Sequence, residues 1–352
     1  MTSCSLFFIS RFSLPKPFLS TVIYLRLLMQ NRRKRHLVLW IVLGIFVLLT
    51  AVLGGASWYM LDYALRPSFN KGRHEAYIWK RIQHSYPSLR PWTDSLRVNH
   101  CLHDTVIVNA RGDSLHGVYL FAPRRSSKVA VVVHGYTDCA IYMLPWAKVY
   151  QEMNYNVLLP ELYGNGRSTG DHQQMGWHDR LDVLQWISIA NKCFGLSDRQ
   201  SRMVVHGISM GAAATMCVSG EQTPAYVKAF VEDCGYTSAW DEFGSELRDQ
   251  FGLPPFPLLY TASALCRLRY GWSFGEASPL RMVARCHKPM LFIHGTKDDF
   301  VPTWMVEPLY KTKPQPKVKW LAKGSAHARS LHDHPQAYRR VVKQFVERYV
   351  EP

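Results

Sequence analysis

A serine held between two glycines is the strongest sign of chemistry in this sequence, in the segment Gly207-Ile208-Ser209-Met210-Gly211. The apolar run RMVVHG leads into it and the small-residue segment AAATMC follows, which predicts a strand, a sharp turn and a helix. In that context Ser209 stands exposed in a strained conformation, while Gly207 and Gly211 leave room for the neighbouring elements. The amino end of a helix also favours a developing anion. We therefore predict that Ser209 is a nucleophile.

A nucleophilic serine needs a base within reach, and His327 is the best candidate. It lies in the small-residue loop Gly324-Ser325-Ala326-His327-Ala328, after the apolar run KVKWLA, where an imidazole can turn towards the serine. His332 and His334 follow in a more polar stretch and are interpreted as surface residues. His134 lies between a buried strand and a loop glycine, where a structural role is more common.

The base in turn needs a carboxylate that accepts its second N–H and holds its tautomer. The strand pattern KPMLFIHG leads into Thr296-Lys297-Asp298, and Asp298 is the favoured acid. Its neighbour Asp299 is the competing candidate, with a helix cap as its other possible role.

Acyl transfer also needs two fixed N–H donors for the oxygen of the tetrahedral intermediate. The backbone N–H of Met210, directly after the nucleophile, is the first expected donor. The buried run KVAVVVHG ends in a loop that continues with Tyr136 and Thr137. We expect the second donor to be the backbone N–H of Tyr136, with Thr137 as the less favoured alternative.

Alternating strand and helix patterns predict the scaffold that positions these residues. Helical spacing occurs at 179–193 and 336–350, and a hairpin is indicated at 104–122. Continuous apolar runs, typical of strands buried on both faces, recur at KVAVVVHG, NVLLPE, RMVVHG, KAFVEDC, KPMLFIHG and KVKWLA. This alternation predicts an α/β protein with a mostly parallel sheet, whose chemistry gathers beyond the carboxyl ends of the strands.

The motifs together resemble the α/β-hydrolase superfamily over residues 104–350. The pieces that carry the resemblance are HGYTD, PELYGNGRSTG, HGISMG, VEDCGYTS, HGTKDDFVP and GSAHARS. They are most similar to its serine aminopeptidase-like and acylhydrolase-like branch, and WHDRLDVLQW is similar to a segment of a membrane-anchored bacterial subgroup. The resemblance implies an α/β-hydrolase fold, in which helices flank a mostly parallel sheet and a small helical cap is present. It also implies the order of nucleophile, acid and base found here.

Two positions qualify the resemblance. Some members place the acid on the earlier strand, which keeps Asp233, at the end of KAFVED, as an alternative to Asp298. The loop pattern acidic-x-Gly-x-Gly-x-Ser begins here with Glu161 rather than aspartate. That position is normally structural, so little change in function is expected.

An insertion at 236–285 is expected to form the cap, and it is rich in aromatic residues. One interpretation is an apolar pocket for an acyl or aryl group. The other is that these rings only attach the cap to the core. The candidate pocket residues are Trp240, Phe243, Phe251 and Tyr260.

A long uncharged run precedes the catalytic region, at 37–61. As a helix it would extend about 37 Å, enough to cross a hydrocarbon core of ~30 Å. The basic block NRRKRH directly before it predicts a cytoplasmic amino end and a catalytic domain outside, facing the periplasm in a Gram-negative cell. The alternative is a cleaved signal peptide and a secreted protein, but the run is long for one and GGASW is a weak cleavage site.

The predicted organisation has four parts: a basic segment at 1–36, a transmembrane signal anchor at 37–61, a linker with a helical lead-in at 62–103, and the hydrolase domain at 104–352. Residues 1–28 are suspected to be absent from the mature protein, because Met29 before NRRKRH would make a good start for an exported chain.

Composition excludes several other classes of protein. The 352 residues carry a formal net charge of +16, but no nucleic-acid recognition motif accompanies it. The eight cysteines form no CxxC pair, so neither a zinc site nor any other metal or cofactor is predicted, although disulfides are possible in an exported domain. The cysteines are Cys4, Cys101, Cys139, Cys193, Cys217, Cys234, Cys266 and Cys286.

Three functions fit these observations. The first is an esterase, lipase or thioesterase that acts on a small-molecule or lipid-like acyl substrate near a membrane. The second is an aminopeptidase or amidase, which needs a carboxylate for the substrate ammonium, with Glu242 and Glu246 as candidates. The third is a catalytically silent binding module tethered to the membrane, which the complete set of catalytic residues argues against. A serine nucleophile also argues against dehalogenase or epoxide-hydrolase chemistry, which uses aspartate.

Overall fold

The structure is a computed structural model that describes residues 16–66, 75–195 and 200–351. It divides into two compact units, Met1–Ala56 and Ser57–Pro352. Part of the predicted basic segment (1–15) and part of the predicted linker (67–74) lie outside the described residues.

The first unit contains most of a long helix, α1 (Lys16–Leu65). Within α1, residues Lys34–Leu65 form a candidate membrane span with a mean hydropathy of 2.8. Its 32 residues exceed the roughly 20 that a helix needs to cross a bilayer. The apolar helix predicted at 37–61 is therefore present as a candidate transmembrane segment or signal anchor.

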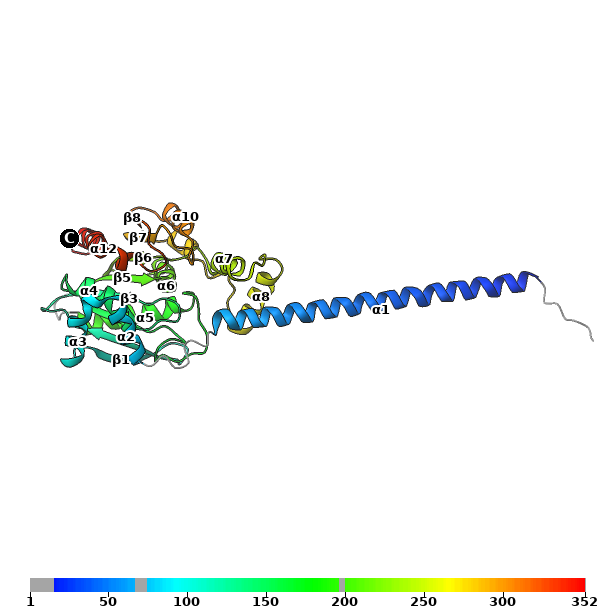
Figure 1. The fold of residues 1–352 in the computed structure, drawn as a ribbon, viewed down its shortest axis with the longest axis horizontal. Helices are drawn as coiled ribbons and strands as arrows, with labels where there is room; N and C mark the ends of the chain where they lie inside the picture. The colour runs from blue at the N-terminus through cyan, green and yellow to red at the C-terminus, as the bar shows by residue number, and fades with distance from the viewer. Residues whose placement is uncertain (1–15, 67–74, 196–199, 352) are drawn as a thin grey trace, which may run out of the picture. The chain divides into compact units, whose positions relative to one another are not determined.

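The second unit is built on an eight-stranded sheet in the order β1-β2-β4-β3-β5-β6-β7-β8 (Figure 1). The strand β2 pairs antiparallel with both β1 and β4, and the remaining pairs are parallel. The strands are β1 (His103–Val108), β2 (Ser114–Leu120), β3 (Lys128–Val133), β4 (Asn156–Pro160), β5 (Arg202–Ile208), β6 (Val227–Asp233), β7 (Met290–Gly295) and β8 (Lys317–Ala322). The predicted mostly parallel sheet is confirmed.

Helices lie on both sides of this sheet (Figure 1). They are α2 (Glu75–Ser85), α3 (Arg90–Val98), α4 (Leu144–Gln151), α5 (Asp179–Phe194), α6 (Met210–Ser219), α7 (Ala239–Phe251), α8 (Leu258–Tyr270), α9 (Pro279–Val283), α10 (Val306–Thr312), α11 (Ser330–Asp333) and α12 (Pro335–Tyr349). Short 3₁₀ turns occur at Pro87–Leu89, Ile141–Met143 and Thr303–Met305.

Both faces of the central strands are buried, which explains why these strands read as continuous apolar runs. On β3, Val129 and Val131 belong to the apolar cluster that includes α5 and α6, while Ala130 and Val132 belong to the cluster that includes α4 and α12. Successive side chains of a strand point to opposite faces, so a strand covered on both sides is made mostly of apolar residues.

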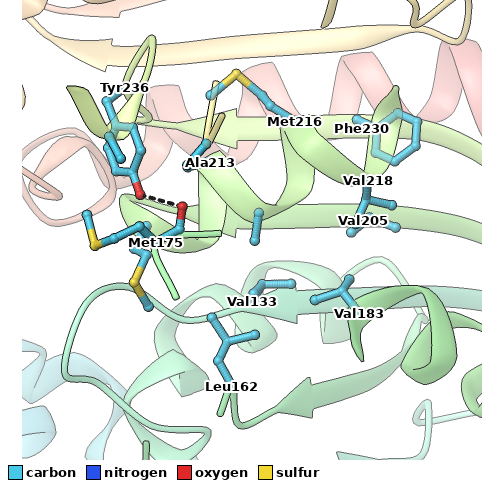
Figure 2. Packing of buried hydrophobic residues seen from close by; sticks show 14 of the residues in the cluster. Val133, Leu162, Met175, Val183, Val205, Ala213, Met216, Val218, Phe230 and Tyr236 are labelled. Carbon is cyan, nitrogen blue, oxygen red and sulfur yellow. Dashed lines mark hydrogen bonds between the residues drawn. The ribbon is translucent and has the colours of Figure 1, made fainter. Parts of the chain in front are cut away.

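The cluster on the α5 and α6 face fixes the strand that carries the predicted nucleophile. Figure 2 shows Val205 of β5 and Phe230 of β6 packed near Val218 of α6. Tyr236, directly after β6, donates its hydroxyl to the backbone oxygen of Met175 at 3.0 Å. This hydrogen bond satisfies a polar group that is otherwise enclosed by apolar side chains.

A buried polar network joins the opposite face of the sheet to α4 and α12. Tyr150 donates to Nδ1 of His206 at 3.0 Å, and the Nε2 of that ring lies 3.1 Å from the hydroxyl of Tyr338. Burial lowers the pKa of His206 to about 3, so the ring is neutral. Trp146 donates to the same hydroxyl at 3.1 Å, and Tyr338 donates to Oδ2 of Asp233 at 2.7 Å. Each hydrogen bond of this network therefore joins one donor to one acceptor.

The predicted cap is the region of α7, α8 and α9, which lies between β6 and β7 in the chain. Ser238 caps α7 by accepting the N–H of Asp241 at 3.0 Å. The same helix ends at Gly252 in the left-handed conformation, with φ of +65°, where glycine adopts the turn without strain. These signals delimit a helix whose buried face contains Ala239 and Leu247 together with the polar residues Glu242 and Ser245.

The shared core predicts a large effect of Phe230, which is fully buried on β6. We expect Phe230→Ala to lower the free energy of unfolding by about 3–5 kcal/mol, because the removed ring leaves a cavity that the sheet cannot close. Leu268→Ala is the control, since Leu268 is 85% exposed on α8 and its loss should change stability by no more than about 0.5 kcal/mol. Chemical denaturation of the full chain in detergent measures both, and equal losses would contradict the packing described.

Candidate active site

The turn from β5 to α6 is too crowded for side chains at its two glycines. A Cβ atom on Gly207 would lie 1.9 Å from the backbone oxygen of Gly211, and one on Gly211 would lie 2.2 Å from the oxygen of Val133. Ser209 between them has φ of +57° and ψ of −119°, a conformation that costs a non-glycine residue free energy. This turn places Ser209 just beyond the end of β5, between the two glycines.

Three predicted side chains meet beyond the carboxyl ends of the strands. Nε2 of His327 lies 2.8 Å from Oγ of Ser209, and its Nδ1 lies 2.8 Å from Oδ2 of Asp298. His327 stands on the loop after β8, and Asp298 on the loop after β7. Because the sheet is parallel here, both loops emerge at the edge where Ser209 lies. A hydroxyl, an imidazole and a carboxylate in this arrangement can pass a proton from oxygen to nitrogen.

Asp298 is buried and surrounded by donors. Besides His327, its Oδ1 accepts the N–H of Val301 at 2.9 Å, and Nε2 of His294 lies 3.4 Å from Oδ2. Burial disfavours the charge, but the hydrogen bonds from the two histidines hold the pKa of Asp298 below its usual value. The neighbouring Asp299 is exposed. Asp298 therefore remains a carboxylate in the folded protein.

The alternative acid, Asp233, has a different partner. Its side chain accepts from Tyr338 in the network on the opposite face, and burial raises its pKa to about 6. Its backbone oxygen accepts the N–H of Ser209 at 2.8 Å. Within the described part of the chain no hydrogen bond joins the carboxyl of Asp233 to His327, so its geometry fits support of the turn.

The loop after β3 lies against the nucleophile. A Cβ atom on Gly135 would be 3.3 Å from Cβ of Ser209, and Tyr136 lines the same cavity as Ser209 and Met210. Thr137, the alternative donor, lines a different cavity. Met210 is the first residue of α6, and the first N–H groups of a helix have no acceptor within it. The positions of Tyr136 and Met210 are thus compatible with a pair of oxyanion donors.

His134 and Glu161 bind backbone groups of the loops that follow β3 and β4. The buried ring of His134 donates from Nδ1 to the oxygen of Gly135 at 2.7 Å and accepts the N–H of Leu162 at Nε2 at 3.0 Å. Burial lowers the pKa of His134, so the neutral ring has one donor and one acceptor. Glu161 accepts the backbone N–H of Arg167 at 2.6 Å. Both side chains therefore make hydrogen bonds to backbone groups, which agrees with a structural role for each.

A cavity of about 540 Å³ opens onto Ser209, within the range of about 300–1,000 Å³ typical of ligand pockets. Two of the four predicted pocket residues, Phe243 and Phe251, line it. Trp240 and Tyr260 are not among the described residues that line this cavity. They lie edge to face with ring centroids 4.8 Å apart, which matches the alternative interpretation of cap aromatics as packing residues.

Glu242 is an unusual member of this cavity because it is a buried acid. Its Oε2 has no hydrogen-bond partner in the described part of the chain. Burial, with the nearby charge of Glu246, raises the pKa of Glu242 well above its usual value. Burial therefore favours the neutral form of Glu242, which can donate a hydrogen bond, and a nearby cation would favour its ionised form.

Cys234, Asp298 and His327 form a group whose ligand atoms lie within 4.8 Å of one another. Burial raises the pKa of the Cys234 thiol well above its usual value, whereas metal binding requires the thiolate. The carboxylate and the imidazole are already joined to each other. This group is therefore poorly suited to hold a metal ion.

Two features of the site are missing from the sequence-based prediction. His294, at the end of β7, contacts Asp298, and its only signal was a histidine before Gly295 in an otherwise apolar strand. Residues at the end of α1, including Met60 and Tyr63, also line the cavity. Met60 belongs to the uncharged run and Tyr63 follows directly after Asp62, so hydropathy gave no sign of a second role.

Comparison with known proteins agrees with this fold. The sequence model that represents the alpha/beta hydrolase family matches residues 130–341 of this chain. The uncharacterised protein YqkD of Bacillus subtilis is 29% identical over 243 residues, covering 69% of this chain and 78% of that protein. The esterase Pf2001 of Pyrococcus furiosus superposes with a TM-score of 0.57 at 20% identity, covering 71% of this chain and 93% of the esterase.

A shorter similarity concerns a lipase. The thermostable monoacylglycerol lipase of Bacillus sp. strain H-257 is 30% identical over 103 residues, which cover 29% of this chain and 39% of the lipase. The family match over more than half of the chain supports a hydrolase. The chain belongs to the α/β hydrolase family.

The buried acid Glu232, on β6, makes the stability of this site depend on pH. Its Oε2 accepts the N–H of Gly235 at 3.0 Å, and burial raises its pKa to about 8 although the charge of His294 opposes this. The folded-state pKa is thus above the unfolded value of about 4.3. The contribution of Glu232 to the free energy of unfolding is complete below its pKa in the unfolded chain. It is lost as the pH rises towards its pKa in the folded protein, about 8.

We predict that Glu232→Gln removes this loss. The unfolding free energy of the variant relative to wild type should rise by on the order of 3 kcal/mol between about pH 5 and about pH 8. Chemical denaturation at stepped pH values measures the difference. Glu347→Gln, at an exposed position of α12, is the control and should show no such trend. A difference for Glu232→Gln that does not change with pH would contradict the prediction.

Proposed function

We propose that the protein is a serine hydrolase that cleaves carboxylic ester or thioester bonds through an acyl-enzyme intermediate. The observation that supports this most directly is the unbroken line of hydrogen bonds from Ser209 through His327 to Asp298, at 2.8 Å each. A serine on a strained turn, beside an apolar cavity, is positioned for attack on a carbonyl carbon.

The proposed reaction has two halves. Oγ of Ser209 attacks the carbonyl carbon while Nε2 of His327 takes the hydroxyl proton, and the oxygen of the tetrahedral intermediate accepts the N–H groups of Tyr136 and Met210. The intermediate collapses when the imidazolium returns the proton to the leaving alcohol or thiol, and an acyl-serine remains. Water then attacks this ester with His327 as base, which releases the acid and restores Ser209. Asp298 stays ionised throughout and stabilises the imidazolium.

An acyl ester is favoured over a peptide by the lining of the cavity. Apolar side chains such as Phe243 and Leu247 enclose most of it, which suits an acyl group. One observation favours the second candidate, an aminopeptidase. Oε2 of Glu242, which has no hydrogen-bond partner among the residues that the structure describes, could bind the ammonium of a peptide substrate. The two candidates share the nucleophile and differ in what the cap recognises.

A probe of the nucleophile tests the proposed chemistry. We predict that a fluorophosphonate labels the wild-type chain and that p-nitrophenyl acyl esters are turned over faster than aminoacyl anilides. Ser209→Ala should abolish both labelling and turnover, because it removes the attacking oxygen. Preference for anilides, lost in Glu242→Gln, would favour the aminopeptidase. A wild type inert to both probe and substrates would favour a binding module.

The acid is tested in the same assay. Asp298→Asn should lower kcat by about 10²–10⁴-fold, because an amide in place of the carboxylate favours the wrong tautomer of His327. Asp299→Asn, at the exposed neighbouring position, is the matched control and should keep wild-type activity. A large loss in Asp233→Asn with a small one in Asp298→Asn would move the acid to the earlier strand.

We further propose that α1 anchors the protein with its amino end in the cytoplasm and the hydrolase domain outside. The basic block at 31–36 before the apolar run supports this orientation. An alkaline phosphatase fused after the last residue should be active and membrane-bound, because this enzyme is active only outside the cytoplasm. A fusion after residue 36 is the inactive control. An inactive carboxyl-terminal fusion would reverse the topology, and an active soluble one would indicate a cleaved signal.

A further inference from the structure

We infer that the carboxyl-terminal end of α1 is a wall of the substrate cavity, and that the enzyme therefore acts on an amphiphile with an apolar acyl chain lying along this helix. The inference rests on the proposed ester hydrolysis and adds the substrate class. Six consecutive residues, Tyr59 to Ala64, line the same cavity as Ser209. They belong to the compact unit that contains the hydrolase fold, which begins at Ser57.

The end of α1 is packed into the domain as a core element. Leu61 and Leu65 are completely buried and belong to the apolar cluster that includes α5 and α6. They are four residues apart and so share one face of the helix. Met60, beside them, is half-buried and lines the cavity. A helix end that only passed the domain by would not place two leucines inside its core.

Polar contacts hold this helix end against α8. Oγ of Ser57 lies 2.6 Å from Oγ1 of Thr261. Arg269 pairs with Asp62 at 2.6 Å and lies over the ring of Trp58 at 4.3 Å from its centroid. Contacts one helical turn apart, at Trp58 and Asp62, fix the rotation of the helix as well as its distance. That rotation decides which side chains face the cavity.

Further contacts join the helix end to α7 and to the loop beside the nucleophile. The hydroxyl of Tyr63 donates to Gln250 at 3.1 Å, and its ring meets that of Phe251 edge to face at 5.6 Å. The hydroxyl of Tyr136 donates to the backbone oxygen of Ala64 at 2.7 Å. The residue whose N–H is the proposed oxyanion donor is therefore tied directly to the end of α1.

The position of this wall in the sequence identifies the kind of substrate. The candidate membrane span, Lys34–Leu65, includes the wall residues themselves. An anchored chain thus presents its cavity wall on the helix that enters the lipid, where amphiphiles are concentrated. The wall offers a methionine and a leucine to an acyl chain, and the carbonyl end of that chain must reach Ser209. A lipid-like acyl ester fits both the apolar wall and the position of Ser209.

Enlarging and shrinking the wall at Met60 tests the inference on the full-length protein. The measurement is the ratio of kcat/KM for p-nitrophenyl dodecanoate to that for p-nitrophenyl butyrate. We expect Met60→Trp to lower this ratio by about ten-fold or more, because the indole fills space that only the longer chain uses. Met60→Ala should raise the ratio or leave it unchanged. Val52→Trp and Val52→Ala are matched controls at a position of α1 that is 62% exposed, and both should keep the wild-type ratio.

Fluorophosphonate labelling of each variant separates the possible failures. Full labelling of Met60→Trp with an unchanged chain-length ratio would overturn the inference and leave the proposed ester hydrolysis intact. A wild type without labelling would remove the proposed function itself. A ratio lowered equally in Met60→Trp and Val52→Trp would show an effect of the membrane anchor in general, and would also overturn the assignment of the wall.

Discussion

The close approach of β3, β5 and α6 around Ser209 is the constraint on which the site depends. A Cβ atom at residue 207 or 211 would clash with backbone atoms, so only glycine allows this turn at both positions. Between them, Ser209 is held at φ of +57°. The backbone N–H of Ser209 is fixed by the oxygen of Asp233 at 2.8 Å, and its own oxygen accepts the N–H of Ala213 at 3.0 Å. The strained conformation persists because packing and hydrogen bonds around it determine it completely.

The same region also confines charge at the end of an apolar sheet. Asp298 keeps its carboxylate because His327, His294 and the N–H of Val301 replace the water that burial removes. His294 is itself buried, and although burial lowers its pKa, the hydrogen bond to Asp298 and the charge of Glu232 raise it above the usual value. Glu232 has the opposite outcome, since burial outweighs its neighbours. The burial of Glu232 thus costs stability, while Asp298 in the same region stays ionised and orients the proposed base.

Much of this arrangement could be predicted from the sequence because it follows from local patterns. Apolar runs located the strands, and the residues on the turns and loops that follow them, including Ser209, Asp298 and His327, had to gather at one edge of a parallel sheet. Contacts across the fold left no such pattern. His294 looked like any strand residue, and the division of cap aromatics into pocket residues such as Phe243 and packing residues such as Trp240 depends on how α7 is rotated.

The end of α1 shows why the boundary of an anchor is hard to place from hydropathy. An uncharged run satisfies both a bilayer and a protein core, because each accepts apolar side chains. Ser57 and Asp62 reveal the second role only through their partners on α8. If this helix end shapes the cavity, it cannot be exchanged for another apolar anchor of equal length without changing what the cavity accepts. Anchoring and substrate choice would then depend on the same residues of the chain.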